Sequence, residues 1–405
     1  MTYVHNIEHQ EIVHRCFRCG YCKFPSDYSD FNCPSYKAFG WDTYSAGGRM
    51  WLIRAWLSGE IKTSPHFAEI LYSCVACDNC KNQCVFPKFK DFLPEIFQET
   101  KVELVNEGRI PPEVRDYFKA IAKNGNPYKL PQSERGKWAE GTGLQPYTDQ
   151  EHLFYVGCVG SYDEVGQKMA RSVGSLLVKA GVSVGIMGSE ETCDGNEVKI
   201  LGEIGLFTQL ANENIEKFKV KGVKKIITLD PHALNIFKKD YPALGGNFQV
   251  FHYTEILAGL IKKKKIKFSA YPVKITYHDP CYLGRHNQIY GPPREILKAI
   301  PGVELLEMRR NSLNAFCCGG GGGNFFTDIL GTGEDSAGRV RVREALETGA
   351  NIIAVACPSC AKMLIDAVKM EKMEDKLDVL GIAEIIERAQ KNKKMIPVLM
   401  RKQTK

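Results

Sequence analysis

The sequence predicts an α/β protein with an all-α part: a helical N-terminal domain followed by two related α/β domains. Three observations predict this fold class. Cysteines near the N-terminus form two triplets, separated by segments whose apolar residues recur at helical spacing. Later in the chain, short β-branched runs end at loops that carry more cysteines, and the middle of the chain repeats that pattern. We divide the chain into residues 1–105, a linker at 106–149, and domains at 150–262 and 263–405.

The composition limits the class of protein. The chain has 405 residues, of which 44% are apolar and 25% charged, and its net charge is +7, as is ordinary for a soluble multidomain protein. The N-terminus lacks the apolar core of a signal peptide, and no apolar run is as long as a membrane span, so we expect a cytoplasmic protein without a transmembrane segment. No basic and aromatic pattern indicates nucleic-acid binding. Fifteen cysteines in such a chain indicate metal ligands or redox groups rather than a disulfide framework.

The two N-terminal cysteine triplets each have an outlying fourth cysteine. The second run, "CVACDNCKNQC", has the C-x2-C-x2-C-x3-C spacing of a cubane [4Fe–4S] site, in which the fourth cysteine reaches a neighbouring cluster. The first run shares the opening but leaves a ten-residue gap before its fourth cysteine. We therefore predict two cubane clusters with crossed ligation, one held by Cys16, Cys19, Cys22 and Cys84 and the other by Cys74, Cys77, Cys80 and Cys33. A pair of zinc sites is the alternative, but zinc needs two pairs of thiolates per site and these thiolates are grouped in threes.

The segments between the triplets predict helices. Apolar residues recur at helical spacing in "RMWLIRAWLSGEI" and in "PHFAEILYSC", and Gly59 lies near the end of the first segment. We therefore expect a helical ferredoxin domain rather than the short hairpins of a small bacterial ferredoxin.

Five further cysteines follow predicted strands in the last domain. "VKITYHDP" and "NIIAVA" are typical of buried parallel strands, and "PREILKAI" and "RVRVREALETG" predict the helices between them. Because open α/β sheets keep their sites at strand ends, we expect five thiolates to gather there: Cys281, Cys317, Cys318, Cys357 and Cys360. The glycines that follow, Gly319, Gly320 and Gly321 first, would let the backbone approach cluster sulfides and donate N–H groups to them, and would leave room for a ligand.

The pattern Cys281…Cys317-Cys318-Gly319…Cys357-Pro358-Ser359-Cys360 resembles the CCG motif of heterodisulfide reductases. In that family the motif binds a non-cubane [4Fe–4S] cluster at a disulfide-reducing site, so the resemblance implies a third cluster on these five cysteines. A ferredoxin domain followed by two such domains is similar to the D-type subunit along essentially its whole length. The sequence departs from the family at Tyr282, where relatives often carry histidine.

Three polar residues flank Cys281: His278, Arg285 and His286. A histidine near a cluster either protonates a leaving thiolate, as a catalytic residue, or hydrogen-bonds a sulfide. Both roles stay open at this point.

The middle domain is a second copy of the pattern that has lost ligands. "FYVGCVGSYDE", "EETCDGNE" and "IITLDPHALN" follow the same plan as the cysteine segments of the last domain. Only Cys158 and Cys193 remain, and Asp230 and Ala233 replace the final pair, so this copy cannot hold the same cluster. Three interpretations stay open: inert packing residues, a zinc site completed by Asp230 or His232, and a substrate-facing thiol or a pair that forms a disulfide.

Two cubanes and one distinct cluster predict an iron–sulfur electron-transfer subunit of a larger anaerobic redox complex. "GGGGGNFF" lacks the context of a dinucleotide-binding motif, so we expect a partner with a flavin, such as a heterodisulfide reductase A-like subunit. Within the family the chain looks most like the electron-transfer subunit of ATP-independent (class II) benzoyl-CoA reductase complexes, which implies an aromatic acyl-CoA reductase as a further partner. Similar proteins serve electron-transferring flavoprotein and acyl-CoA dehydrogenase systems.

The alternative function is a thiol/disulfide reductase in which the third cluster is catalytic. The loss of ligands in the middle domain favours a relay over a reductase. Cleavage of one disulfide between two clusters needs a cluster in each copy, and the middle domain cannot hold one. An oxygen-sensing regulator is disfavoured, because no DNA- or effector-binding element accompanies the cysteines.

Overall fold

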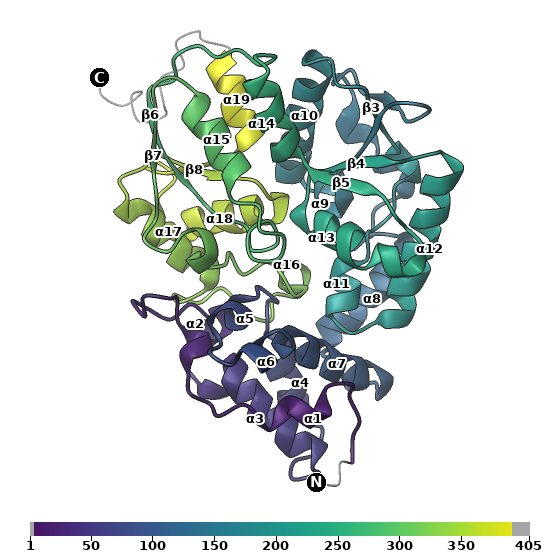
Figure 1. Ribbon diagram of the computed structural model, residues 1–405, viewed down its shortest axis with the longest axis vertical. Helices are drawn as coiled ribbons and strands as arrows, with labels where there is room; N and C mark the ends of the chain where they lie inside the picture. Colours follow the sequence, from purple (N-terminus) through teal and green to yellow (C-terminus); the bar gives the residue numbers. More distant parts are fainter. Residues whose placement is uncertain (1–3, 391–405) are drawn as a thin grey trace.

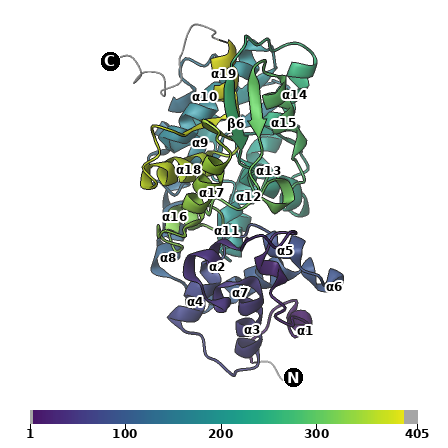
Figure 2. The same cartoon turned by 90° about the vertical axis from the view of Figure 1, so that its left-hand side faces the viewer.

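The structure, a computed structural model, describes residues 4–390 and has three parts (Figure 1). An all-α N-terminal part lies below two α/β parts that stand side by side, and the view turned by 90° shows it beneath both (Figure 2). The predicted fold class, an α/β protein with an all-α part, is confirmed. The end of the predicted last domain, 391–405, lies outside the described residues.

Two of the N-terminal helices begin at serine residues that cap them. The Ser45 hydroxyl accepts a hydrogen bond from the Gly48 N–H at the start of one helix, and Ser64 accepts one from Phe67 at the start of the next. These two helices occupy the segments predicted from apolar spacing, and Trp56 of the first is fully buried. The helices of this part are α1 (Gln10–Val13), α2 (Pro34–Phe39), α3 (Ala46–Leu57), α4 (Pro65–Tyr72), α5 (Asn79–Gln83), α6 (Pro87–Lys90), α7 (Leu93–Asn106) and α8 (Pro112–Asn124).

The middle part is built on a five-stranded parallel sheet in the order β1-β3-β2-β4-β5. Its strands are β1 (Gln145–Pro146), β2 (His152–Tyr155), β3 (Val184–Ile186), β4 (Lys225–Thr228) and β5 (Gln249–His252). Its helices are α9 (Gly157–Tyr162), α10 (Glu164–Lys179), α11 (Asn196–Ile200), α12 (Ile204–Val220), α13 (Pro231–Lys239) and α14 (Tyr253–Lys262).

The last part is built on a four-stranded parallel sheet in the order β7-β6-β8-β9. Its strands are β6 (Val273–Tyr277), β7 (Val303–Leu306), β8 (Ile352–Val355) and β9 (Asp378–Gly381). Its helices are α15 (Gly291–Ala299), α16 (Asn324–Thr327), α17 (Ala337–Glu347), α18 (Pro358–Met370) and α19 (Ile382–Gln390). All four residues of β8 are buried, as its unbroken apolar run predicts for a central parallel strand.

The two sheets share one topology. The order β3-β2-β4-β5 of the middle part repeats as β7-β6-β8-β9 in the last part, as an internal duplication requires. Equivalent helices also begin alike: the Cys357 sulfur accepts from the Cys360 N–H at the start of α18, and the Asp230 carboxylate accepts from the His232 N–H at the start of α13. Asp230 therefore keeps the capping role of the cysteine that it replaces.

The segment expected to link the first two domains is built into the fold. Residues 106–149 contain helix α8 and strand β1, which pairs with β3 at the edge of the first sheet. Arg135 from the same segment is fully buried. Within residues 4–390, no helix is both long enough and apolar enough to cross a membrane.

Candidate iron-sulfur centres

The eight N-terminal cysteines line two cavities. Cys16, Cys19, Cys22 and Cys84 surround a small one. Cys33, Cys74, Cys77 and Cys80 lie around a larger one of about 430 Å³, and Cys22 lies on the walls of both. Each outlying cysteine is thus beside the triplet that is more distant in sequence. Four thiols around one cavity are a suitable donor set for a cubane, and this grouping supports the crossed assignment.

The two N-terminal sites differ in exposure. Cys19 is exposed, whereas Cys77 is buried. Phe17, which lines the cavity of the first site, is 70% exposed. The first site therefore faces the surface, and the second lies toward the two α/β parts.

The five cysteines of the last domain meet in one buried group. The Cys281 and Cys317 sulfurs are 3.8 Å apart, and those of Cys318 and Cys360 are 3.2 Å apart. Cys357 lies in the same group, bound by the Cys360 N–H at 3.5 Å. Cys281 and Cys357 lie in short loops at the carboxyl ends of β6 and β8, and Cys360 lies in the first turn of α18, as expected from the position of sites in open parallel sheets.

The ferredoxin domain contacts this group directly. The Cys77 side chain belongs to the same cluster of buried side chains as Cys317, and the interaction with Cys317 raises the pKa of Cys77. Arg285 fixes the contact, since its Nε donates to the Cys77 carbonyl at 2.6 Å and its Nη1 donates to the Ala315 carbonyl at 2.6 Å. His286 adds a bond from Nε2 to the Ala76 carbonyl at 2.9 Å. Arg285 and His286 thus join two domains, and both are engaged by backbone carbonyls.

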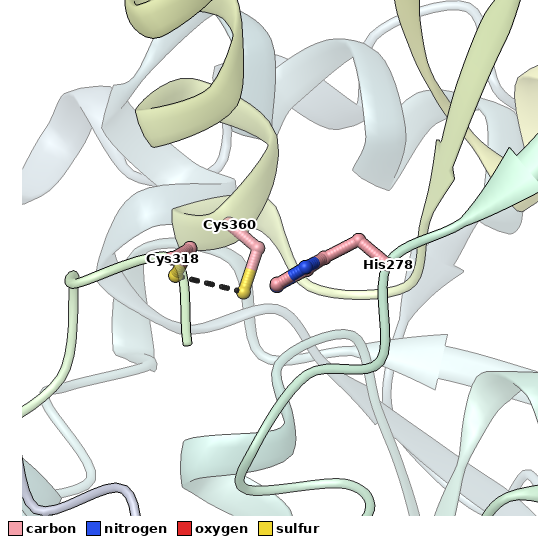
Figure 3. Close-up of side chains that lie close together, drawn as sticks. All are labelled: His278, Cys318 and Cys360. Atoms are coloured by element: carbon pink, nitrogen blue, oxygen red, sulfur yellow. Dashed lines mark hydrogen bonds between the residues drawn. The ribbon is translucent and has the colours of Figure 1, made fainter. Parts of the chain in front are cut away.

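His278 points at the cysteines of the third site. Figure 3 shows its ring directed toward the Cys360 sulfur, with Cys318 beyond, and the three ligand atoms lie within 4.8 Å of one another. Nδ1 accepts a hydrogen bond from Arg341 Nε at 3.1 Å, so the proton of the neutral ring is on Nε2. Nε2 is buried and has no hydrogen-bond partner among the described residues. Burial, together with the nearby Arg341 guanidinium, lowers the pKa of His278 to about 3. This geometry favours a hydrogen-bond donor to the site over a proton donor.

The glycine run, residues 319–323, lies against the loop that carries Cys74 and Val75. A Cβ on Gly321 would lie 2.6 Å from the Val75 carbonyl oxygen, and one on Gly322 would lie 2.3 Å from the Cys74 carbonyl oxygen. The space that we expected to remain for a ligand is therefore filled at these two positions by the loop of the second cubane site. Closer to the cysteines, the Gly319 N–H donates to the Cys317 sulfur at 3.4 Å, as predicted for a loop that approaches a cluster.

His232 of the middle copy belongs to an aromatic stack, and the potential ligand atoms of Asp230, His232 and Cys357 lie within 4.8 Å of one another. Tyr282 lies between His232, with centroids 3.9 Å apart, and His286, with centroids 4.1 Å apart. His232 is also bound to the Glu197 carboxylate at 2.5 Å. Among the described residues, no group of potential metal ligands within mutual reach includes Cys158 or Cys193, so the zinc interpretation gains no support.

Two charged residues of these sites could not be identified from the sequence: Arg135 and Arg341. Both lie outside the cysteine motifs. Both are fully buried, and this burial, which identifies them, exists only in the folded chain.

Models of two protein families match this chain. A cysteine-rich domain, the CCG domain, matches residues 152–238 and 275–365, and a 4Fe-4S dicluster domain matches residues 12–86. The two CCG matches correspond to the two parallel sheets.

Three relatives illustrate the similarity. The chain is 38% identical to "Probable iron-sulfur-binding oxidoreductase FadF" of Bacillus subtilis, over 82% of this chain and 47% of the relative. It is 34% identical to "EtfAB:quinone oxidoreductase" of Syntrophomonas wolfei, over 80% of this chain and 47% of the relative. It is 31% identical to the D-type subunit of "Dihydromethanophenazine:CoB--CoM heterodisulfide reductase" of Methanosarcina barkeri, over 92% and 93%. The chain thus spans about half the length of the first two and nearly all of the third.

A solved structure shares the fold. The crystal structure of a hypothetical protein from Helicobacter pylori has a TM-score of 0.57 and 12% identity, and the match covers 96% of this chain and 73% of that one.

Proposed function

Since this chain belongs to the family of heterodisulfide reductase D-type iron–sulfur proteins, we propose that it is an electron-transfer subunit with two cubane clusters and a third, non-cubane cluster. Such clusters carry single electrons between neighbouring sites. The contact of Cys77 with Cys317 carries the proposal, because it brings the second N-terminal site against the third. The first site, with its exposed Cys19, provides the end that a partner can reach.

The size of the cavity beside the third site favours a relay over a reductase for soluble disulfides. This cavity, lined by Gly320 and Ser359 on one side, is about 40 Å³. Sites for small molecules usually provide roughly 300 Å³ or more. The middle copy offers no second cluster opposite, since the Asp230 carboxylate is engaged in capping α13 and Ala233 has no ligand atom.

The names of the relatives support one class of partner. Of the three relatives, one is named as an oxidoreductase of EtfAB and quinone, and none is named for benzoyl-CoA. We therefore propose an electron-transferring flavoprotein as the electron donor or acceptor of this chain. Exchange with an aromatic acyl-CoA reductase is the second candidate, and it depends on the sequence resemblance over residues 19–56 alone.

Anaerobic stopped-flow mixing tests this proposal. Full-length chain with its clusters is mixed with reduced electron-transferring flavoprotein, or with reduced benzoyl-CoA reductase, and the iron–sulfur absorbance is followed. We expect rapid, saturable bleaching with the flavoprotein and little turnover of a small thiol disulfide by the isolated chain. Robust disulfide reduction that is lost in Cys317→Ala would contradict the relay and establish the reductase.

A further inference from the structure

Two thiols of the middle copy lie together in the interior, outside the predicted ligand sets. Cys158 lies in the first turn of α9, after β2, and Cys193 lies in the loop before α11. They are 8% and 6% exposed. Both line one cavity, and their interaction lowers the pKa of Cys158 and raises that of Cys193. Two thiols that are 35 positions apart in sequence thus lie together in the fold.

A buried ion pair fixes both cysteine segments. Arg135 Nη1 approaches the Cys158 sulfur at 3.5 Å, and Nη2 donates to the Glu191 carboxylate at 3.0 Å and to the Thr192 carbonyl at 3.1 Å. Glu191 in turn accepts from the N–H groups of residues 156 and 157, directly before Cys158. Burying such a pair costs several kcal/mol before its own interactions repay that cost. Inert packing residues would not require it.

The two sulfurs differ in acidity. The interaction with Cys193, helped by the Arg135 guanidinium, lowers the pKa of Cys158 despite its burial. The interaction with Cys158, together with burial, raises the pKa of Cys193. A thiol of lowered pKa beside a thiol of raised pKa is the arrangement that thiol–disulfide chemistry uses. Arg135 Nε has no partner among the described residues, so this buried cation is not saturated by carboxylates.

The pair faces the third cluster site across a shared cavity. The cavity of about 40 Å³ is lined by Cys158 and Cys193 and, from the last domain, by Gly320 and Ser359. Gly320 follows Cys318-Gly319, and Ser359 lies between Cys357 and Cys360. The cavity can hold a water molecule, and Asp194 also lines it, with its pKa raised by burial to about 6. Thiols, a proton acceptor and the loops of the third site therefore meet in one place.

We propose that Cys158 and Cys193 form a redox-active dithiol/disulfide pair that exchanges electrons with the third cluster site. In oxidation the two S–H bonds break and one S–S bond forms. Two protons leave through the carboxyl-lined cavity, and two electrons leave one after the other toward the third site and the cubanes. Reduction reverses each change. The pair would store two electrons next to carriers that move one at a time. The destination of the electrons rests on the proposed function, whereas formation of the disulfide does not.

Thiol trapping tests whether the pair forms. The full-length chain with its clusters is equilibrated anaerobically in dithiothreitol buffers from fully reduced to fully oxidised, then denatured, alkylated and analysed by peptide mass spectrometry. We expect a peptide linked through Cys158 and Cys193 at oxidising ratios and two alkylated thiols at reducing ratios. Cys158→Ser should leave Cys193 alkylated throughout. Two free thiols at every ratio, in a chain whose clusters are intact, would overturn the proposal.

Photoreduction tests the link to the third site. A chain carrying the disulfide is reduced with a one-electron deazaflavin donor, and the number of thiols released is counted against time. We expect two thiols per chain in the wild type and at least tenfold slower release in Cys317→Ala, in which iron analysis verifies that the cubanes remain. Equal rates would show that the pair bypasses the third site and would overturn this link. If the flavoprotein assay of the proposed function failed instead, the thiol-trapping result would stand unaffected.

Discussion

The Cys77 side chain of the ferredoxin domain and the Cys317 side chain of the last domain meet across the domain boundary in one cluster of buried side chains. Cys77 belongs to the second predicted cubane and Cys317 to the third cluster site. The residues around them hold the two domains together. Arg285 donates hydrogen bonds to carbonyls on both sides of the boundary. Gly321 and Gly322 have no side chain, so their loop can lie against the Cys74 and Val75 carbonyls. Several residues therefore hold the predicted second cubane site and the third cluster site in contact.

Comparing alanine variants of two glycines distinguishes the free-energy cost of backbone strain from that of disturbing the contact with the ferredoxin domain. Gly322 and Gly331 have φ values of +61° and +66°, so alanine at either position incurs about 1 kcal/mol of left-handed strain. Only the Cβ at Gly322 meets an obstacle, since Gly331 has nothing within 4 Å. We expect Gly322→Ala to lose roughly 1–3 kcal/mol more than Gly331→Ala in anaerobic unfolding. Equal losses would mean that the glycines serve the loop alone and not its contact with the ferredoxin domain.

Arg285 should act through the domain boundary. Lysine keeps the charge but cannot present the guanidinium fork that bonds to Cys77 and Ala315 together. We expect Arg285→Lys to lower the free energy of unfolding by roughly 1–3 kcal/mol and to increase amide exchange in residues 74–78. Arg309→Lys, at an exposed arginine, is the matched control and should change neither quantity. Unchanged exchange in Arg285→Lys would show that the boundary does not depend on this residue.

Crossed ligation predicts which signal each serine variant disturbs. Cys33→Ser should alter the spectrum of the cluster on Cys74, Cys77 and Cys80, and Cys84→Ser should alter that of the first cluster, because each outlying cysteine shares a cavity with the other triplet. The wild type should contain about twelve iron atoms per chain and substoichiometric zinc. The opposite pattern in the two variants would mean that Cys33 and Cys84 must be exchanged in the ligand assignment. An iron content of about eight atoms per chain would show that the third cluster is absent.

His278 should tune the third site without titrating. Its ring is directed at the site, its Nε2 has no hydrogen-bond partner among the described residues, and its pKa is about 3, so the ring is neutral throughout the physiological range. Hydrogen bonds to cluster sulfurs stabilise the more negative, reduced state. We expect His278→Phe to lower the potential of the third cluster by roughly 40 mV, the one-electron equivalent of about 1 kcal/mol. His278→Gln retains an N–H donor and should restore part of the shift.

The pH dependence of the same measurement distinguishes the two roles of His278. For a neutral hydrogen-bond donor, the difference in potential between wild type and His278→Phe stays constant from about pH 6 to about pH 8. A difference that grows as the pH falls would show that the ring takes up a proton on reduction, as a catalytic acid would.

Local pattern and spacing are enough to predict much of the fold. The β-branched runs before Cys281 and Cys357 form β6 and β8, since a buried parallel strand needs little beyond an apolar run that ends at a loop. The cysteines of the last domain gather at the carboxyl ends of these strands for the same reason. The repeat of the pattern predicts two sheets of one topology.

Contacts between domains cannot be predicted in this way. That Cys77 meets Cys317, or that Gly322 lies against the Cys74 carbonyl, depends on how three parts of the chain pack, and no local periodicity encodes it. Residues 106–149 have the composition of a linker, because they are rich in proline, glycine and polar residues. Yet they form α8 and the strand β1, which pairs with β3 at the edge of the first sheet. They also supply the buried Arg135, which contacts the Cys158 sulfur.

The most direct test of the relay is the electron paramagnetic resonance spectrum of the fully reduced chain. Dipolar and exchange coupling between reduced clusters falls steeply with distance, so sites joined through Cys77 and Cys317 must couple. We predict a split spectrum for the wild type that simplifies in Cys317→Ala to the pattern of two interacting cubanes, with about eight iron atoms retained. A wild-type spectrum equal to that of Cys317→Ala plus an isolated third signal would contradict the contact and the electron path proposed through it.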